Sequence, residues 1–122
     1  MSARTIRLPW AKPPLSLNDR GHTRHSRYGR VVDEARWTIR AQRHEPITPP
    51  VEAVLHWRLP DRRRRDADNL AAVVKAVLDA VVREGLLPDD SWRYVPRIGI
   101  ELHAPDPARG VAMWLTLTGV EA

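Results

Sequence analysis

The chain has 122 residues, no cysteine, 43% hydrophobic residues and a formal net charge of +5 at pH 7. This length and apolar content suit one domain over residues 1–122, because domains cluster at roughly 100–150 residues. The lack of cysteine excludes disulfide frameworks, zinc–thiolate sites and cysteine nucleophiles. No apolar run approaches the roughly 18 residues that span a bilayer, and the first residues lack the apolar segment of a signal peptide. We therefore expect a soluble, cytoplasmic protein that does not contact a membrane.

The charges are distributed unevenly along the chain. Residues 1–65 carry 15 basic and 6 acidic side chains, a net of +9, whereas residues 66–122 carry 5 basic and 9 acidic ones, a net of −4. A basic half beside an acidic half suggests a polyanionic partner bound near a carboxylate-rich centre. Arginine outnumbers lysine 18 to 2, and a GC-rich genome alone produces such a bias. Composition does not decide between these interpretations.

Hydrophobic patterning predicts four strands and two helices. The expected strands cover residues 3–9, 51–59, 92–103 and 111–118, and the expected helices cover residues 30–45 and 67–84. Residues 17–30 are expected to form a polar, basic loop, and Gly85 to stand at the C′ position of the second helix. The order strand, helix, strand, helix, strand, strand predicts a small α+β domain with helices packed on a mixed sheet.

The aromatic and histidine side chains carry weaker signals. Trp37, Trp57 and Trp114 are expected in the core. The histidines of the basic loop, His22 and His25, are more typical of a solvated or phosphate-facing pair than of metal ligands. The remaining histidines show no relation to one another in the sequence and receive no role; they are His44, His56 and His103.

The helix expected over residues 67–84 has an apolar face and a polar stripe. At about 100° per residue, Asp68, Lys75 and Asp79 return to nearly the same direction, opposite the face that will be buried. A solvated helix surface with a Lys75–Asp79 pair is one interpretation of this stripe. The residues immediately before the helix favour a functional one.

Two aspartates stand two positions apart where the chain enters this helix, in the segment Asp66-Ala67-Asp68-Asn69. Alternate residues of extended backbone point the same way, so both carboxylates can approach one cation. Helix capping would explain one aspartate well but two poorly. Asp89 and Asp90 add two carboxylates in a later turn, which only a strand returning beside the helix would bring back to the first pair. Carboxylate ligands without a convincing histidine set favour Mg²⁺ or Mn²⁺ over zinc.

An arginine run, Arg62–Arg65, lies directly before these carboxylates. Such a run is usually a solvated surface. Beside a candidate metal site, phosphate binding is the better interpretation, because guanidinium groups bind phosphate bidentately and stay charged. Arginines of the first long loop are expected to extend this surface. The candidates for binding a nucleic-acid backbone are Arg20, Arg24, Arg27, Arg62, Arg63, Arg64 and Arg65.

The segment from Leu59 to Leu70, which reads LPDRRRRDADNL, resembles the signature of RusA-type Holliday junction resolvases, small endonucleases of phages and prophages. Two further regions agree with this family, and the similarity covers nearly the whole chain in the right order. These regions are Leu8-Pro9-Trp10 with Pro13-Pro14 and Asn18-x-Arg20, and Leu78-Asp79-Ala80 with Gly85-Leu86 and Asp89-Asp90.

The resemblance implies a homodimeric, Mg²⁺-dependent endodeoxyribonuclease, without a small-molecule cofactor, that resolves four-way DNA junctions by paired cuts. Position by position, it makes Asp66, Asp68 and Asp90 the metal-binding, catalytic carboxylates. The family's essential helix lysine is expected four residues after the second aspartate, where this chain has Ala72. Lys75, three residues further on, is therefore the candidate for that role.

Three other residues, Asn69, Asp79 and Asp89, are expected to support these groups, with Asp79 orienting Lys75 or a metal-bound water. Three alternative functions remain open. They are a non-catalytic DNA-binding module of the same fold, a nuclease of broader specificity for flaps or forks, and a nucleotidyl-transfer site. The last would require a phosphate-binding Gly/Ser motif, and none is visible in the sequence.

Overall fold

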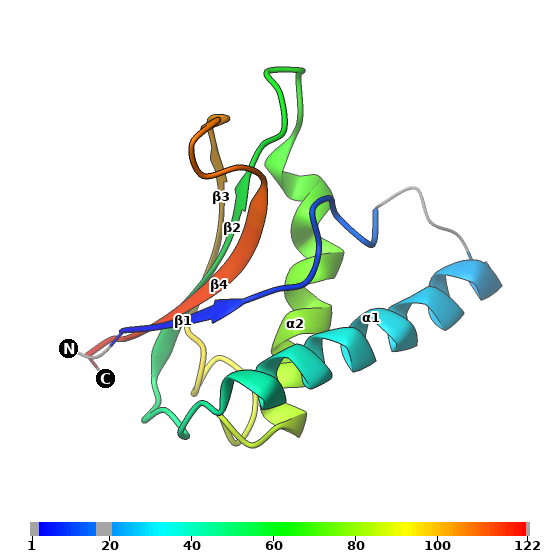
Figure 1. Ribbon diagram of the computed structural model, residues 1–122. Coiled ribbons are helices and arrows are strands. Elements are labelled where there is room, and N and C mark those ends of the chain that lie inside the picture. The colour runs from blue at the N-terminus through cyan, green and yellow to red at the C-terminus, as the bar shows by residue number, and fades with distance from the viewer. Residues whose placement is uncertain (1–2, 17–20, 122) are drawn as a thin grey trace.

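The structure is a computed structural model that describes residues 3–16 and 21–121, with only the backbone described for residues 21–25 (Figure 1). Its strands and helices follow the predicted order, which confirms the α+β class. None of the described helices is long and apolar enough to cross a membrane. In chain order the elements are β1 (Ala3–Arg7), α1 (Gly21–Gln42), β2 (Val51–Arg58), the short 3₁₀ helix η1 (Ala67–Leu70), α2 (Ala71–Arg83), β3 (Arg97–His103) and β4 (Ala112–Gly119).

The strands form one mixed sheet in the order β1-β4-β2-β3. β4 pairs antiparallel with β1 and with β2, whereas β3 pairs parallel with β2. The parallel pair requires a long crossover, which η1 and α2 provide. Figure 1 shows α1 and α2 together on one side of the sheet, and no described element covers the other side. We call this uncovered side the open face of the sheet.

Alternation along the two central strands defines the core. Successive side chains of a strand point to opposite faces, so every second residue is directed toward the helices. These buried side chains are Val51, Ala53, Leu55 and Trp57 in β2, and Met113, Leu115 and Leu117 in β4. α2 packs against them with most of its length buried. Burying one such leucine or valine contributes about 1.5–3 kcal/mol, so the sheet–helix interface provides a stable base for the loops at its ends.

Two predicted boundaries are wrong. Residues 21–30, expected in a loop, form the first turns of α1. Once the packed part of α1 has nucleated the helix, each further turn costs little, so the helix can extend into polar residues. Apolar periodicity begins only at Val31 and could not reveal those turns. β3 begins at Arg97 and not at residue 92, because the amides of Tyr94 and Val95 both bond to the carbonyl oxygen of Ser91 and form a turn. Gly85, with φ +81°, confirms the expected end of α2.

Of the three tryptophans expected in the core, one lies there and two do not. Trp57 is 6% exposed and lies in the core as expected. Trp37 is 67% exposed, with the Arg40 guanidinium 4.9 Å from its ring centre, so its expected core position is wrong. Trp114 is also outside the core, because it occupies an outward position of β4 and lies half-buried on the open face.

A partly buried carboxylate joins the ends of the two helices. Glu84 follows α2, and its oxygens accept hydrogen bonds from Arg36 Nε and Arg40 Nε of α1, both at 2.9 Å. The hydrogen bond from Arg40, followed by that from Arg36, lowers the pKa of Glu84 from 4.5 to about 2. The charged form of Glu84 therefore holds α1 against α2.

We expect Glu84→Gln to lower the free energy of unfolding at pH 7 by about 1–2 kcal/mol, because both arginines are partly solvated. In the wild type this contribution is complete above pH 4.5 and is lost as the pH falls toward about 2, since the unfolded chain takes up the proton first. Urea unfolding at pH 7, 4.5 and 2.5 measures the difference. Asp33→Asn, which changes an exposed carboxylate of α1, is the control. It should leave the free energy of unfolding and its pH dependence unchanged.

Candidate active site

Asp66 and Asp68 lie where extended chain becomes helix. Asp66 has extended backbone (φ −109°, ψ 130°) and precedes η1, whose first turn contains Asp68. Neither η1 nor α2 has a side-chain capping hydrogen bond at its start; the turn is closed by the Asn69 amide, which donates to the Asp66 carbonyl oxygen at 3.2 Å. Both carboxylates are exposed. Asp66 thus occupies the N-cap position of η1, but neither carboxylate is used as a capping acceptor.

The four consecutive arginines are not equivalent. Arg65 is turned inward: its Nη1 donates to the Asp61 carboxylate at 2.7 Å, and its guanidinium lies 5.4 Å from the ring centre of Trp57. Arg63 is 85% exposed, with Nε 3.7 Å from the same carboxylate. The segment Arg62–Arg64 therefore faces solvent, while Arg65 holds the loop against the core.

The arginines expected from the first loop are only partly visible. Arg20 lies outside the described residues, and so does the side chain of Arg24. Arg27 is exposed on α1. Of these candidate arginines, the structure therefore describes Arg27 and the segment Arg62–Arg64 as exposed.

Lys75 and Asp90 line the same groove, between α2 and the edge strand β3. The groove has a volume of about 360 Å³, and the rest of its wall is apolar, formed by Ala71, Val74, Leu78, Ile98 and Ile100. Because β3 returns alongside α2, the turn that carries Asp90 comes back to the helix. The structure thus brings the candidate lysine together with the third candidate carboxylate.

Asp66 lies in a different cavity of about 360 Å³, which it shares with Arg64, Arg65 and Asn69. Among the described residues, Asp66, Asp68 and Asp90 do not form a group whose oxygens all lie within 4.8 Å of one another. The structure therefore places Asp66 and Asn69 at one cavity and Lys75 and Asp90 at another.

Asp79 faces α1 and has a partner other than Lys75. The hydroxyl of Tyr28 donates to its Oδ2 atom in a half-buried position between the helices. Burial, then this hydrogen bond, raises the pKa of Tyr28 above its usual range, and the charge of Asp90 adds to the effect. Lys75 and Asp79, both described, form no ion pair, so the Lys75 ammonium remains available to the groove.

Asp89 is used within its own turn. Hydrogen bonds from the Asp90 amide and then from the Ser91 hydroxyl lower the pKa of this exposed carboxyl. These contacts tie Asp89 to the turn that contains Asp90, and its expected supporting role stays a prediction.

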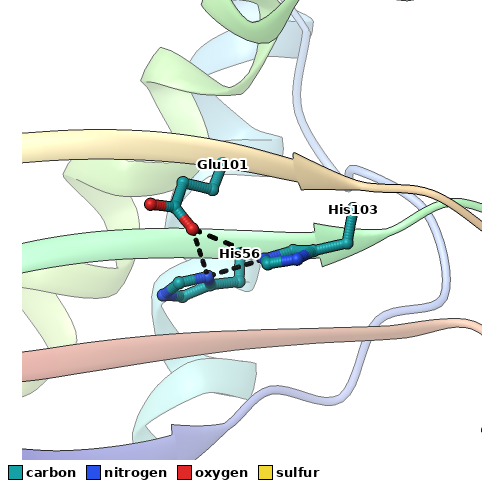
Figure 2. Close-up of side chains that lie close together, drawn as sticks. All are labelled: His56, Glu101 and His103. Atoms are coloured by element: carbon teal, nitrogen blue, oxygen red, sulfur yellow. Dashed lines mark hydrogen bonds and ion pairs between the residues drawn. The ribbon is translucent and has the colours of Figure 1, made fainter.

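The open face carries a cluster that sequence reasoning missed. The register of β2 and β3 sets His56 opposite Glu101 and Arg58 opposite His103. Glu101 and His103 stand two residues apart on β3, so their side chains point to the same face as the side chain of His56. Figure 2 shows His56, Glu101 and His103 converging on one point. The only signal in the sequence is the spacing Glu101-x-His103, typical of neighbours on one face of a strand. The third member requires the strand register, which the sequence does not show.

An acidic helix start bordered by exposed arginines, with a lysine in an adjacent groove, is typical of enzymes that act on phosphodiesters. Comparison with known proteins agrees. The family model "Endodeoxyribonuclease RusA" matches residues 12–109, a range that contains every candidate catalytic residue. The chain belongs to the RusA family of endodeoxyribonucleases, which confirms the resemblance of its central motif.

Similar relatives come from bacteria and from a phage. "Crossover junction endodeoxyribonuclease RusA" of Escherichia coli (strain K12) is 35% identical over 97 residues, which cover 75% of this chain and 77% of the relative. The protein of the same name from Shigella sonnei (strain Ss046) is 34% identical over 97 residues, with the same coverage. The corresponding protein of Enterobacteria phage 82 is 34% identical over 97 residues, again covering 75% and 77%.

Proposed function

We propose that this chain is a structure-specific endodeoxyribonuclease that resolves four-way DNA junctions in a Mg²⁺-dependent hydrolysis, during recombination, repair or phage DNA processing. Family membership and the names of its relatives support this substrate. The observation that carries the proposal is the state of Asp66 and Asp68: both are exposed at the start of a helix, and neither carboxylate makes a capping hydrogen bond there, although Asp66 occupies the N-cap position of η1. Their oxygens are therefore available to a cation.

The donor set fits a hard divalent cation. Carboxylate oxygens are the ligands that Mg²⁺ and Mn²⁺ prefer. Asp66 and Asp68 would hold such an ion, and Asp90, which lines a separate groove in the structure, is the third proposed ligand. When bound, the ion lowers the pKa of water and offsets charge on the phosphate. Lys75 supplies a second positive charge in the groove that it shares with Asp90, where it would stabilise the negative charge that develops on the phosphate.

DNA binding rests on the exposed arginines. Arg62–Arg64 precede Asp66 with only Arg65 between them, so a DNA backbone that they hold would pass close to the carboxylates. A four-way junction has near two-fold symmetry, and an isologous homodimer would match it and present two active sites. One small domain supplies one site, so cutting both strands requires two copies.

Cleavage of a four-way junction should be compared with cleavage of duplex, flap and fork substrates of the same sequence in Mg²⁺. We expect preferential cleavage of the junction, with paired nicks in opposing strands. Equal cleavage of flaps or forks would instead support the broader nuclease. Junction binding without cleavage, in a folded protein supplied with Mg²⁺ or Mn²⁺, would support the non-catalytic module and contradict the proposal.

The arginine surface makes a separate prediction. Arg62→Gln with Arg64→Gln should weaken junction binding and reduce the log–log dependence of affinity on salt by about 1.8, since each lost phosphate contact removes about 0.9. The control is Arg93→Gln with Arg97→Gln, which removes the same charge from exposed positions before and at the start of β3. Titrations from 50 to 300 mM salt give both slopes. An unchanged slope in the first variant, or an equal change in both, would show that Arg62 and Arg64 do not contact phosphates.

A further inference from the structure

The cluster on the open face has the composition and spacing of a metal site. His56 Nδ1 lies 2.8 Å from His103 Nε2 and 3.4 Å from Glu101 Oε2, and His103 Nε2 lies 3.7 Å from the same oxygen. A tetrahedral zinc ion, with ligand distances of about 2.0–2.2 Å, separates its donor atoms by about 3.3–3.6 Å. The three observed distances bracket that range, so small rotations of the side chains would complete the geometry.

The ring of His56 is oriented by its second nitrogen. Nε2 lies 2.9 Å from Thr116 Oγ1, and the Thr116 hydroxyl is itself directed at the Val54 carbonyl oxygen, 3.5 Å away. In the tautomer that carries its proton on Nε2, His56 donates to Thr116 Oγ1 and keeps the Nδ1 lone pair directed toward the cluster. A hydrogen-bonded second nitrogen is the usual arrangement of a metal-ligating histidine.

Trp114 fixes the plane of the same ring. Its indole stacks on His56 with ring centres 5.1 Å apart and an angle of 1° between the planes, and its ring centre is also 5.1 Å from that of His103. The side chains of His56, His103 and Glu101 are 12%, 37% and 59% exposed. One ligand is thus held rigidly, while the other two border solvent and leave a path for an ion.

We propose that His56, Glu101 and His103 bind a transition-metal dication of the zinc type, with a fourth coordination position open to solvent. Two imidazole nitrogens and one carboxylate suit Zn²⁺, Co²⁺ or Ni²⁺, whereas Mg²⁺ takes oxygen ligands. The site is separate from Asp66, Asp68 and Asp90, and it does not depend on the proposed nuclease function. Because its ligands come from β2 and from the edge strand β3, a bound ion would tie that edge to the centre of the sheet.

The test uses protein without a histidine tag, titrated with Co²⁺ for visible absorption bands of tetrahedral coordination and with Zn²⁺ for affinity. We expect one Zn²⁺ per chain in the wild type. His103→Gln and Glu101→Gln change a half-buried and an exposed ligand and should each weaken Zn²⁺ binding by at least about 100-fold, with the Co²⁺ bands lost. Thr116→Val should weaken binding by about tenfold, the size of effect typical of a partner outside the ligand shell.

Two controls separate this site from other donors. His44→Gln removes a histidine that lies near Gln42, outside the cluster, and should leave Zn²⁺ affinity unchanged. Asp68→Asn removes a carboxylate of the candidate active site and should retain the Co²⁺ bands. The proposal fails if folded wild-type protein binds neither ion, or if His103→Gln and Glu101→Gln bind Zn²⁺ as His44→Gln does. It also fails if Asp68→Asn abolishes the Co²⁺ bands.

Discussion

Asp68→Asn is expected to bind a four-way junction nearly as well as the wild type and to lose cleavage in Mg²⁺ by roughly 10³-fold or more. The amide keeps the size of the side chain but removes the negative charge that would hold the cation. Metal assistance is worth several kcal/mol in the transition state, and each 1.36 kcal/mol is tenfold in rate. Binding should persist because it rests on the exposed segment Arg62–Arg64. Single-turnover cleavage and gel-shift titration measure the two effects.

Asp33→Asn makes the same chemical change at an exposed position of α1 and should leave cleavage intact. Normal cleavage by Asp68→Asn would show that this carboxylate is not a metal ligand. Asp66→Asn and Asp90→Asn extend the test, because these two carboxylates line different cavities in the structure. If all three hold the same ion, all three variants should lose cleavage to a similar degree. An active Asp90→Asn variant would confine the ligands to the pair at the start of the helix.

The fold was predictable wherever a packed surface imposes a period on the sequence. β2 and β4 bury every second side chain, and α2 buries a stripe of aliphatic residues, so hydrophobic patterning revealed all three. The first turns of α1 carry no such pattern, because the apolar periodicity of this helix begins only at Val31. Trp37 illustrates the same limit: its size predicted burial, but it lies on the outer side of α1 beneath Arg40.

The candidate site was predictable as far as it lies in one continuous segment. Asp66, Asp68 and the arginines before them are neighbours in sequence, so their proximity required no knowledge of the fold. The hydrogen bond between Tyr28 and Asp79 depends on how α1 packs against α2. No local sequence pattern reveals that packing. The cluster of His56 with residues of β3 depends on strand register, and a shift of one residue would direct its members to opposite faces.

Lys75→Ala is expected to lower the single-turnover rate of junction cleavage by about 10²–10³-fold, the usual effect of removing one group that stabilises transition-state charge. Junction affinity should change little, since at most one phosphate contact is lost. The structure supports this role because Tyr28 holds Asp79, so the Lys75 ammonium is not paired with that carboxylate and can act in the groove beside Asp90. Arg83→Ala, which removes another exposed cation of α2, is the control.

The position of the lysine can be tested directly by moving it. Residues three apart on a helix are neighbours on one side, displaced by about 4.5 Å along the axis, which lies within the reach of a lysine side chain. Lys75→Ala combined with Ala72→Lys should therefore recover part of the lost rate, although Ala72 is partly buried against the core and circular dichroism must confirm folding. Recovery would show that an ammonium on this side of α2 acts on the phosphate. Full activity of Lys75→Ala alone would contradict the assignment. Stabilisation of the negative charge on the phosphate would then come from the metal and the arginines.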